Sequence, residues 1–230
     1  EAGDTDALVN LGLLYADQKR YPEAEKLYLQ AIEAGNTNAL FNLGLLFANQ
    51  KRYPEAEKLY LQAIEAGDTD ALVNLGLLYA DQKRYPEAEK LYLQAIEAGD
   101  TDALKNLGLL YHDQKRYPEA EKLYLQAIEA GDTDALKNLG LLYHDQKRYP
   151  EAEKLYLQAI EADVIFAHRN LGRLYENLKR YDDAESRYRE GIVNGDPNSA
   201  NALIDLLENL NRTEEAAKLR AEYPDLGEEP

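Results

Sequence analysis

Apolar and polar residues alternate along the chain with a helical period, and the same alternation returns every 32 residues. The block at residues 4–35 recurs without a change at residues 68–99, and close copies begin at Asn36, Asp100 and Asp132. A period of 20 to 50 residues is typical of stacked-repeat proteins, in which each unit buries its apolar face against its neighbours. One leucine marks the register from end to end: Leu11, Leu43, Leu75, Leu107, Leu139, Leu171 and Leu203.

Each block predicts two antiparallel helices, and the first of them covers about residues 6–19. Asp4 or Thr5 is placed to accept the free amide hydrogens of its first turn. We expect this helix to end by Tyr21, because Tyr21 precedes Pro22 and a residue before proline avoids helical geometry.

The second helix of the block is predicted from Pro22 to Ala34. Proline suits the first turn, where its missing amide hydrogen costs nothing, and Glu23 and Glu25 favour the positive end of the helix. Gly35 follows as a left-handed cap. The later second helices are expected to begin at Pro54, Pro86, Pro118, Pro150, Asp182 and Thr213.

A glycine in the middle of the first helix indicates close helix packing. Gly12 costs about 1 kcal/mol relative to alanine, which makes sense if a neighbouring helix leaves no room for a side chain. Ala24 and Ala31 are its expected small partners. Helical spacing groups the packing faces as Leu8, Leu11, Gly12 and Tyr15 on the first helix and Ala24, Leu27, Tyr28 and Ala31 on the second.

This alternation of small and large residues resembles the tetratricopeptide repeat, over essentially the whole chain. The resemblance implies an all-α fold, an α-solenoid of about seven helix-turn-helix units that wind into a right-handed superhelix with the first helices on the concave side. The block has 32 residues where the family usually has 34, and its Ala-Gly-Asp turn is similar to that of Sel1-type repeats.

The predicted solenoid occupies residues 1–223, and residues 224–230 form an acidic tail. Ile204, Leu207 and Arg220 replace the glycine and both tyrosines of the seventh unit, which indicates a terminal cap. Glu1–Gly3 matches the end of a repeat, so we expect a chain that was cut from a longer array or built artificially, and identical copies indicate recent duplication or deliberate design. The units are residues 5–36, 37–68, 69–100, 101–132, 133–164, 165–196 and 197–223.

Composition excludes several classes of function. The net charge of −17 argues against nucleic acid or an anionic membrane as the partner, since both require basic patches. The absence of cysteine excludes disulfides, thiolate metal sites and cysteine nucleophiles. No apolar run approaches a membrane span and no signal-peptide pattern opens the chain, so the cytoplasm is the expected location, although the compartment stays open.

Catalysis has little support in the sequence, and we expect neither an enzyme nor a cofactor. Only His112, His144 and His168 could act as bases near neutral pH, and no serine or threonine belongs to a nucleophile motif. His112 and His144 occupy equivalent positions and could share a metal ion, but a catalytic zinc normally takes three protein ligands. Surface histidines are the simpler interpretation.

The five close copies separate fixed positions from varied ones. Residues 19–34 are identical in all five, whereas the first helix varies at a few positions. At 100° per residue, Asn38, Phe41, Ala48 and Asn49 fall on one face, opposite the packing face. We call this face of the first helices the variable stripe, and we expect it to be exposed. The second copy differs on this stripe at Asn38, Phe41 and Asn49. The fourth copy differs at Lys105 and His112, and the fifth at Lys137 and His144.

One asparagine per repeat runs along the variable stripe. A side-chain amide both donates and accepts hydrogen bonds, so such a row can pair with the backbone of an extended peptide. The row is similar to the asparagine ladders of the kinesin light chain and O-GlcNAc transferase repeat domains. Hydrogen bonds between adjacent helices are the alternative role. The asparagines are Asn10, Asn42, Asn74, Asn106, Asn138 and Asn170.

We therefore expect a non-enzymatic scaffold that binds an extended peptide or protein segment in a concave groove. Apolar residues dominate the first units and cations the later ones, so a ligand with an apolar and an acidic end would fit. The alternative function is end-to-end self-association through the uncapped first repeat. Besides the asparagines, the predicted groove residues are Val9, Phe41, Leu45, Asn49, Val73, Leu77, Lys105, His112, Lys137, His144, Arg169 and Arg173.

Overall fold

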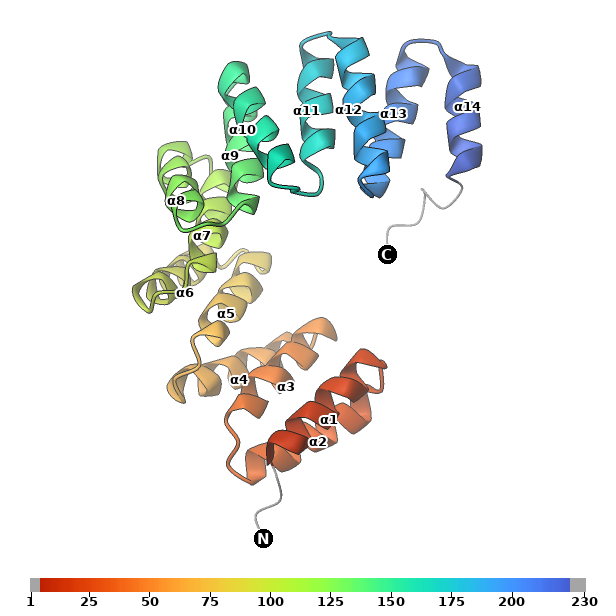
Figure 1. The fold of residues 1–230 in the computed structure, drawn as a ribbon. Helices are drawn as coiled ribbons and strands as arrows, with labels where there is room; N and C mark the ends of the chain where they lie inside the picture. Colours follow the sequence, from red (N-terminus) through yellow and green to blue (C-terminus); the bar gives the residue numbers. More distant parts are fainter. Residues whose placement is uncertain (1–4, 224–230) are drawn as a thin grey trace. The chain divides into compact units, whose positions relative to one another are not determined.

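The computed structural model describes residues 5–223, and within that range it contains fourteen α-helices and no strands (Figure 1). The chain divides after Lys115 into two units, each described by itself. The first unit holds α1 (Thr5–Asp17), α2 (Tyr21–Glu33), α3 (Asn38–Asn49), α4 (Tyr53–Glu65), α5 (Asp70–Asp81), α6 (Tyr85–Glu97) and α7 (Asp102–Asp113). The second holds α8 (Tyr117–Glu129), α9 (Asp134–Asp145), α10 (Tyr149–Glu161), α11 (Ala167–Asn177), α12 (Tyr181–Val193), α13 (Pro197–Asn209) and α14 (Thr213–Glu222).

Helix pairs stack on one another within each unit. In the first unit α1 packs on α2, α2 packs on α3, and α1 also contacts α3. The same three contacts join α3, α4 and α5. A first helix therefore touches both its own partner and the first helix of the next repeat. Helix-turn-helix repeats of the predicted kind are confirmed.

Aspartates cap α5 and α7, and the adjacent threonines do not. Asp68 Oδ1 accepts a hydrogen bond from the amide of Ala71 at 3.1 Å, while Thr69 makes no capping bond. Asp100 Oδ1 likewise accepts bonds from the first-turn amides of Asp102 and Ala103. Of the two predicted capping residues, Asp4 lies outside the described residues and Thr5 is itself the first residue of α1.

The first helix of each repeat ends for a different reason from the one predicted. In the first repeat α1 stops at Asp17, and Lys19 adopts a left-handed conformation with φ of 58°. The amide of Arg20 then bonds the carbonyl of Tyr15 at 2.8 Å, which closes a Schellman-type turn. Tyr21 is the first residue of α2, so the expectation that it avoids helical geometry before Pro22 is wrong.

The second helix ends as the sequence predicts. Ala34 caps α2, Gly35 has a φ of 89°, and the amide of Asn36 bonds the carbonyl of Ala31 at 2.9 Å. Glycine adopts this left-handed conformation without the penalty that a side chain would bring.

The mid-helix glycine is confirmed as a point of close approach, but its partner is an aromatic ring. A Cβ atom on Gly12 would lie 2.6 Å from Cε1 of Tyr28, and Tyr28 is fully buried. The three atoms nearest to that Cβ all belong to Tyr28, so the closest partner is the ring and not one of the predicted alanines, Ala24 and Ala31, which are both fully buried. The other described pairs are Gly44 with Tyr60, Gly76 with Tyr92, Gly140 with Tyr156 and Gly172 with Tyr188.

An arginine–glutamate–tyrosine cluster joins neighbouring repeats within each unit. The guanidinium of Arg84 donates to Glu57 of the preceding repeat at 3.0 Å and to Glu87 of its own repeat at 3.1 Å. It also lies 3.7 Å from the ring centre of Tyr79, whose hydroxyl donates to Glu57 at 2.8 Å. In the second unit the equivalent pairs are Arg148 with Glu121, Arg180 with Glu153 and Arg212 with Glu185.

The last helix pair replaces the glycine–tyrosine contact with different chemistry. Ile204 and Leu207 are buried, whereas Arg220 is exposed and pairs with Glu208 at 3.0 Å. A polar residue thus stands on the exposed side of α14. The predicted tail at 224–230 lies outside the described residues.

Candidate functional site

A pocket of about 190 Å³ lies between α3 and α5 in the first unit. Leu45 and Leu77 contribute apolar walls, Asn49 and Asn74 contribute amides, and Asp81 contributes a carboxylate. Four of these five residues belong to the predicted groove set. The remaining lining residues are Ala48, Tyr53, Tyr60 and Leu78.

The glycine–tyrosine contact positions this pocket. Tyr60 of α4 reaches α3 where Gly44 leaves room for its ring, and the ring then forms part of the pocket wall. Phe41 supports it from the side, with the two ring centres 6.1 Å apart. The invariant second helix therefore supplies a rigid wall, while the varied first helices supply the residues that differ.

The asparagines on α3 and α5 bond within their own helices. Asn42 donates from its amide nitrogen to the carbonyl of Asn38, and Asn74 donates to the carbonyl of Asp70, both at 2.9 Å. The alternative expectation of bonds between adjacent helices is therefore wrong for these two residues. The bond fixes the orientation of the amide and uses one of its two hydrogens, and the amide oxygen has the chemistry of an acceptor.

Exposure of the asparagine row differs between repeats. Asn10 is exposed, Asn106 in the first unit and Asn170 in the second are half-buried, and Asn138 in the second unit is buried. Asn138 therefore fits a ligand-contacting role less well than Asn74 does.

Two valines of the predicted groove face the core instead of solvent. Val9 is 7% exposed and Val73 is 9% exposed, so the expectation that they line an open surface is wrong. The first helix of a repeat packs against the second helix of its own repeat and also against the first helix of the following repeat. It therefore has two buried faces. Phe41, at the equivalent position in α3, is half-buried against Tyr60.

Burial and nearby carboxylates raise the pKa values of the core tyrosines. Burial raises the pKa of Tyr60 to about 12. Burial likewise raises the pKa of Tyr28 to about 12, and there the carboxylate of Asp17 adds to the effect. In α3 the residue equivalent to Asp17 is the neutral Asn49. Tyr60 therefore has no carboxylate at this position of its own repeat, and the pocket between α3 and α5 carries one negative charge fewer.

The predicted cations of the second unit are partly neutralised within the protein. Lys137 lies 3.7 Å from the carboxylate of Asp134, and Arg169 lies 3.5 Å from the buried carboxylate of Asp196. Arg173 is exposed on α11. Of the three, Arg173 is the best placed to meet an acidic ligand. In the first unit Lys105 is half-buried on α7.

The histidines do not gather into a metal site. Within residues 5–223 there is no group of three or more histidine or acidic side chains that could hold a metal ion. His144 Nε2 lies 2.7 Å from the amide nitrogen of Asn177, and its Nδ1 lies 3.5 Å from Asp145. His112 is half-buried on α7 in the first unit.

Sequence reasoning missed the tyrosines of the pocket. Tyr53 and Tyr60 belong to the invariant second helix, which the comparison of copies classified as scaffold. The signal that could have found Tyr60 is Gly44, since a mid-helix glycine leaves room for a bulky side chain from a neighbouring helix.

Tetratricopeptide-repeat family models match residues 9–71, 68–132, 100–164 and 132–192. The chain belongs to the tetratricopeptide repeat family. No curated protein matches the sequence.

Solved structures of repeat proteins share this fold. A tetratricopeptide repeat protein from Parabacteroides merdae matches with a TM-score of 0.74 and 19% identity, over 97% of this chain and 93% of that one. A Sel1 repeat protein from Oxalobacter formigenes matches with a TM-score of 0.68 and 24% identity, over 97% and 99% of the two chains. The pilF protein of Pseudomonas aeruginosa matches with a TM-score of 0.68 and 21% identity, over 81% and 89%.

Repeats of this family commonly mediate protein–protein interaction and are typically non-catalytic scaffolds. No helix between residues 5 and 223 is both long enough and apolar enough to cross a bilayer.

Proposed function

We propose that this repeat protein binds an extended peptide segment of a partner protein at the pocket between α3 and α5. The observation that carries the proposal is the convergence of Leu45, Asn49, Asn74 and Leu77 on one pocket. The copies vary at few positions, and one of these, Asn49, contributes its side chain to the pocket.

The pocket suits an apolar side chain of the ligand. Leu45 of α3 and Leu77 of α5 both line the pocket, and an apolar contact with a ligand releases water from both partners. Leu77 is 43% exposed, so a ligand can reach it without a rearrangement of the helices. Tyr53 and Tyr60 add aromatic surface to the pocket lining.

Backbone recognition is the proposed role of Asn74. Its orientation is fixed by the bond to Asp70, so little conformational entropy is lost when its oxygen accepts an amide hydrogen of the ligand. Asp81, about two turns further along α5, also lines the pocket and favours a ligand with a basic residue next to the apolar one.

A peptide-library screen against the full chain tests this proposal. We expect the selected peptides to share an apolar residue flanked by a basic one. Replacing Asn74 and Asn106 together by alanine should weaken the selected peptide and leave the thermal unfolding midpoint close to that of the parent protein. Unchanged affinity would remove the backbone-recognition role of the asparagines.

End-to-end self-association is the second candidate function, and one observation favours it. Leu11 and Leu14 of α1 are 39% and 51% exposed, whereas the equivalent Leu43 and Leu46 are 1% and 4% exposed. The last repeat offers a poor counterpart, since Ala217 stands where the other repeats carry the glutamate that binds arginine. Sedimentation over a concentration series separates the two candidates, because a strict monomer at high concentration removes self-association.

A further inference from the structure

One face of α1 carries apolar side chains at positions that α3 and α5 bury. Ala7, Leu11 and Leu14 lie on this face, because residues three and four apart share one side of a helix. Ala7 is exposed, and Leu11 and Leu14 are 39% and 51% exposed. The equivalent residues of α3 and α5 are all buried. We call these three residues of α1 the open face.

In the following repeats a second helix covers the equivalent face. The helix α2 packs on α3, and α4 packs on α5. The guanidinium of Arg52, just after α3, donates to Glu25 of α2 at 2.8 Å. Tyr79 and Arg84 donate in the same way to Glu57 of α4, at 2.8 and 3.0 Å. A glutamate of the covering helix thus meets the donors at one end of an apolar contact.

The first repeat carries the same donors beside its open face. Tyr15 and Arg20 are the equivalents of Tyr79 and Arg84, and Arg20 lies 4.1 Å from the ring centre of Tyr15. Within residues 5–223 the ion pair of Arg20 is with Glu23 of its own repeat, and no carboxylate accepts from the Tyr15 hydroxyl. The Arg20 side chain is 47% exposed, against 35% for Arg84.

The contact of α10 with α11 in the second unit shows the polar end of such a covering helix. Glu153 of α10 accepts a hydrogen bond from the hydroxyl of Tyr175 at 2.7 Å and one from the guanidinium of Arg180 at 3.3 Å. Tyr175 and Arg180 are the equivalents of Tyr15 and Arg20. A covering helix therefore needs a glutamate at this position to satisfy both donors.

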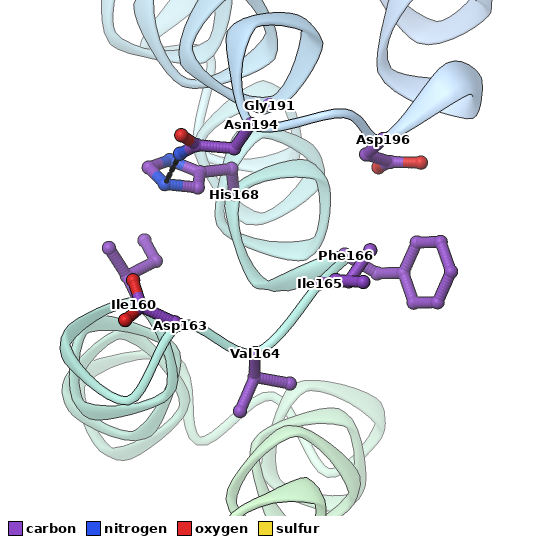
Figure 2. A pocket seen from close by; sticks show the side chains of 9 residues that line it. All are labelled: Ile160, Asp163, Val164, Ile165, Phe166, His168, Gly191, Asn194 and Asp196. Carbon is purple, nitrogen blue, oxygen red and sulfur yellow. Dashed lines mark hydrogen bonds between the residues drawn. The ribbon is translucent and has the colours of Figure 1, made fainter.

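The apolar end of the same contact lies six residues further along α10. Ala159 shares a buried cluster with Ala167, the equivalent of Ala7, and Ile160 packs against that cluster. Figure 2 shows Ile160 at the end of α10, beside a cavity of about 150 Å³ and the loop that leads to α11. Because the start of α11 meets the end of α10, the two helices run antiparallel.

We infer that the open face of α1 binds an amphipathic helix of a partner protein. The partner helix runs antiparallel to α1 and carries a glutamate followed six residues later by alanine and isoleucine. Its glutamate accepts from Tyr15 and Arg20, and its apolar residues cover Leu11 and Leu14. The charge pair at one end fixes the direction of the helix. The peptide pocket between α3 and α5 shares no residue with this face.

The last helix of a second copy does not fit this description. Ala217 of α14 stands at the position of the glutamate, and Tyr223 stands at the position of the alanine. The helix itself ends at Glu222, before that second position. A helix from a different protein is therefore the occupant that the charges of the open face favour.

The probe for the test is a synthetic peptide with the sequence of α10, residues 149–161. A helix of this length is marginal in water, so a lactam bridge joins Lys154 to the side chain of Gln158→Glu. Both positions are exposed in the protein, so the bridge lies outside the contact. The peptide is titrated into the full chain and followed by the NMR methyl signals of Leu11 and Leu14. We expect saturable shifts at both residues.

The charge pair is tested from both sides. The bridged peptide with Glu153→Gln should bind about tenfold more weakly, because it loses the charge-assisted hydrogen bonds. In the protein, Arg20→Gln should weaken the parent peptide to a similar extent. The matched control is Arg84→Gln, whose arginine already bonds Glu57 within the chain and which should leave peptide affinity unchanged.

The apolar part of the contact has its own matched pair of variants. Leu14→Asp should abolish the shift at Leu11. Leu29→Asp should bind the peptide as the parent protein does, because Leu29 lies outside the contact. Leu29 is 44% exposed, and its equivalent Leu61 is also 44% exposed although a repeat precedes it. Circular dichroism melting curves check that each variant folds.

Three results would overturn the inference: no saturable shifts at Leu11 and Leu14, equal binding of the Glu153→Gln peptide, or equal losses in Arg20→Gln and Arg84→Gln. Sedimentation of the parent protein tests the other occupant. Self-association that Leu14→Asp abolishes would assign the open face to a second copy and would likewise overturn the inference.

Discussion

Gly76 of α5 and Tyr92 of α6 approach so closely that a Cβ atom on Gly76 would lie 2.6 Å from the tyrosine ring. We predict that Gly76→Ala destabilises the protein by about 1–3 kcal/mol, because the ring must shift in a tightly packed core. Helix propensity alone predicts a gain of about 1 kcal/mol for the same change. Urea unfolding of the full chain decides the sign.

The double variant Gly76→Ala with Tyr92→Leu is the control for this contact. A smaller side chain on α6 relieves the clash, so the two changes together should cost less than the sum of the single changes. Additive effects would show that the ring contact is not the reason for the glycine.

Coupling between repeats through Glu57 gives a second prediction. Glu57 accepts hydrogen bonds from Arg84 and from Tyr79, both in the following repeat. Glu57→Gln should lower the unfolding midpoint by a few degrees. Glu87→Gln should lower it less, because Glu87 is more exposed and bonds Arg84 within the same repeat. Equal effects of the two variants would contradict a special role for the bond between repeats.

Alkaline pH should destabilise the protein through its buried tyrosines. Burial raises the pKa of Tyr60 to about 12, above the ordinary value of 10.0. The folded state therefore holds this proton more tightly, so its contribution is complete below pH 10 and is lost as pH rises toward 12. A shift of two units corresponds to roughly 2–3 kcal/mol. Urea unfolding at a series of alkaline pH values measures the loss, which should be smaller in Tyr60→Phe.

Asn49 gives a prediction about the electrostatics of the peptide pocket. Asp17 and Asp81 hold the equivalent position in α1 and α5, and each raises the pKa of the buried tyrosine in its own repeat. Asn49→Asp should therefore raise the pKa of Tyr60 further, which spectrophotometric titration of tyrosinate measures. The same variant should favour selected peptides with more basic residues. An unchanged titration would place Asn49 too far from Tyr60 for this effect.

The sequence predicts the helix pairs, the left-handed Gly35 and the close approach at Gly12, because each follows from local rules of backbone geometry. It does not predict that Tyr28 is the partner of Gly12, since that contact depends on how two helices cross. Nor does it predict the left-handed Lys19, because lysine has no preference for that conformation and the surrounding turn imposes it.

The candidate site was likewise predicted from the sequence only in part. Periodicity places Leu45, Asn74 and Leu77 on one face, and the structure brings them to one pocket. It also places Val9 and Val73 on the open surface, where the structure buries them, because a helical wheel represents one packing face and these helices have two.

The most direct test of the proposed binding function compares two leucines of equal exposure. Leu77 lines the peptide pocket and Leu93 lies on the second helix of the same repeat, and both are 43% exposed. Aspartate at either position should affect stability to a similar, small extent. Isothermal titration calorimetry with a peptide selected by the library screen should show a loss of affinity of at least about tenfold for Leu77→Asp, because a charge replaces the apolar wall. Leu93→Asp should bind as the parent protein does. Equal affinity of the two variants, or a larger loss for Leu93→Asp, would contradict peptide binding at the pocket between α3 and α5.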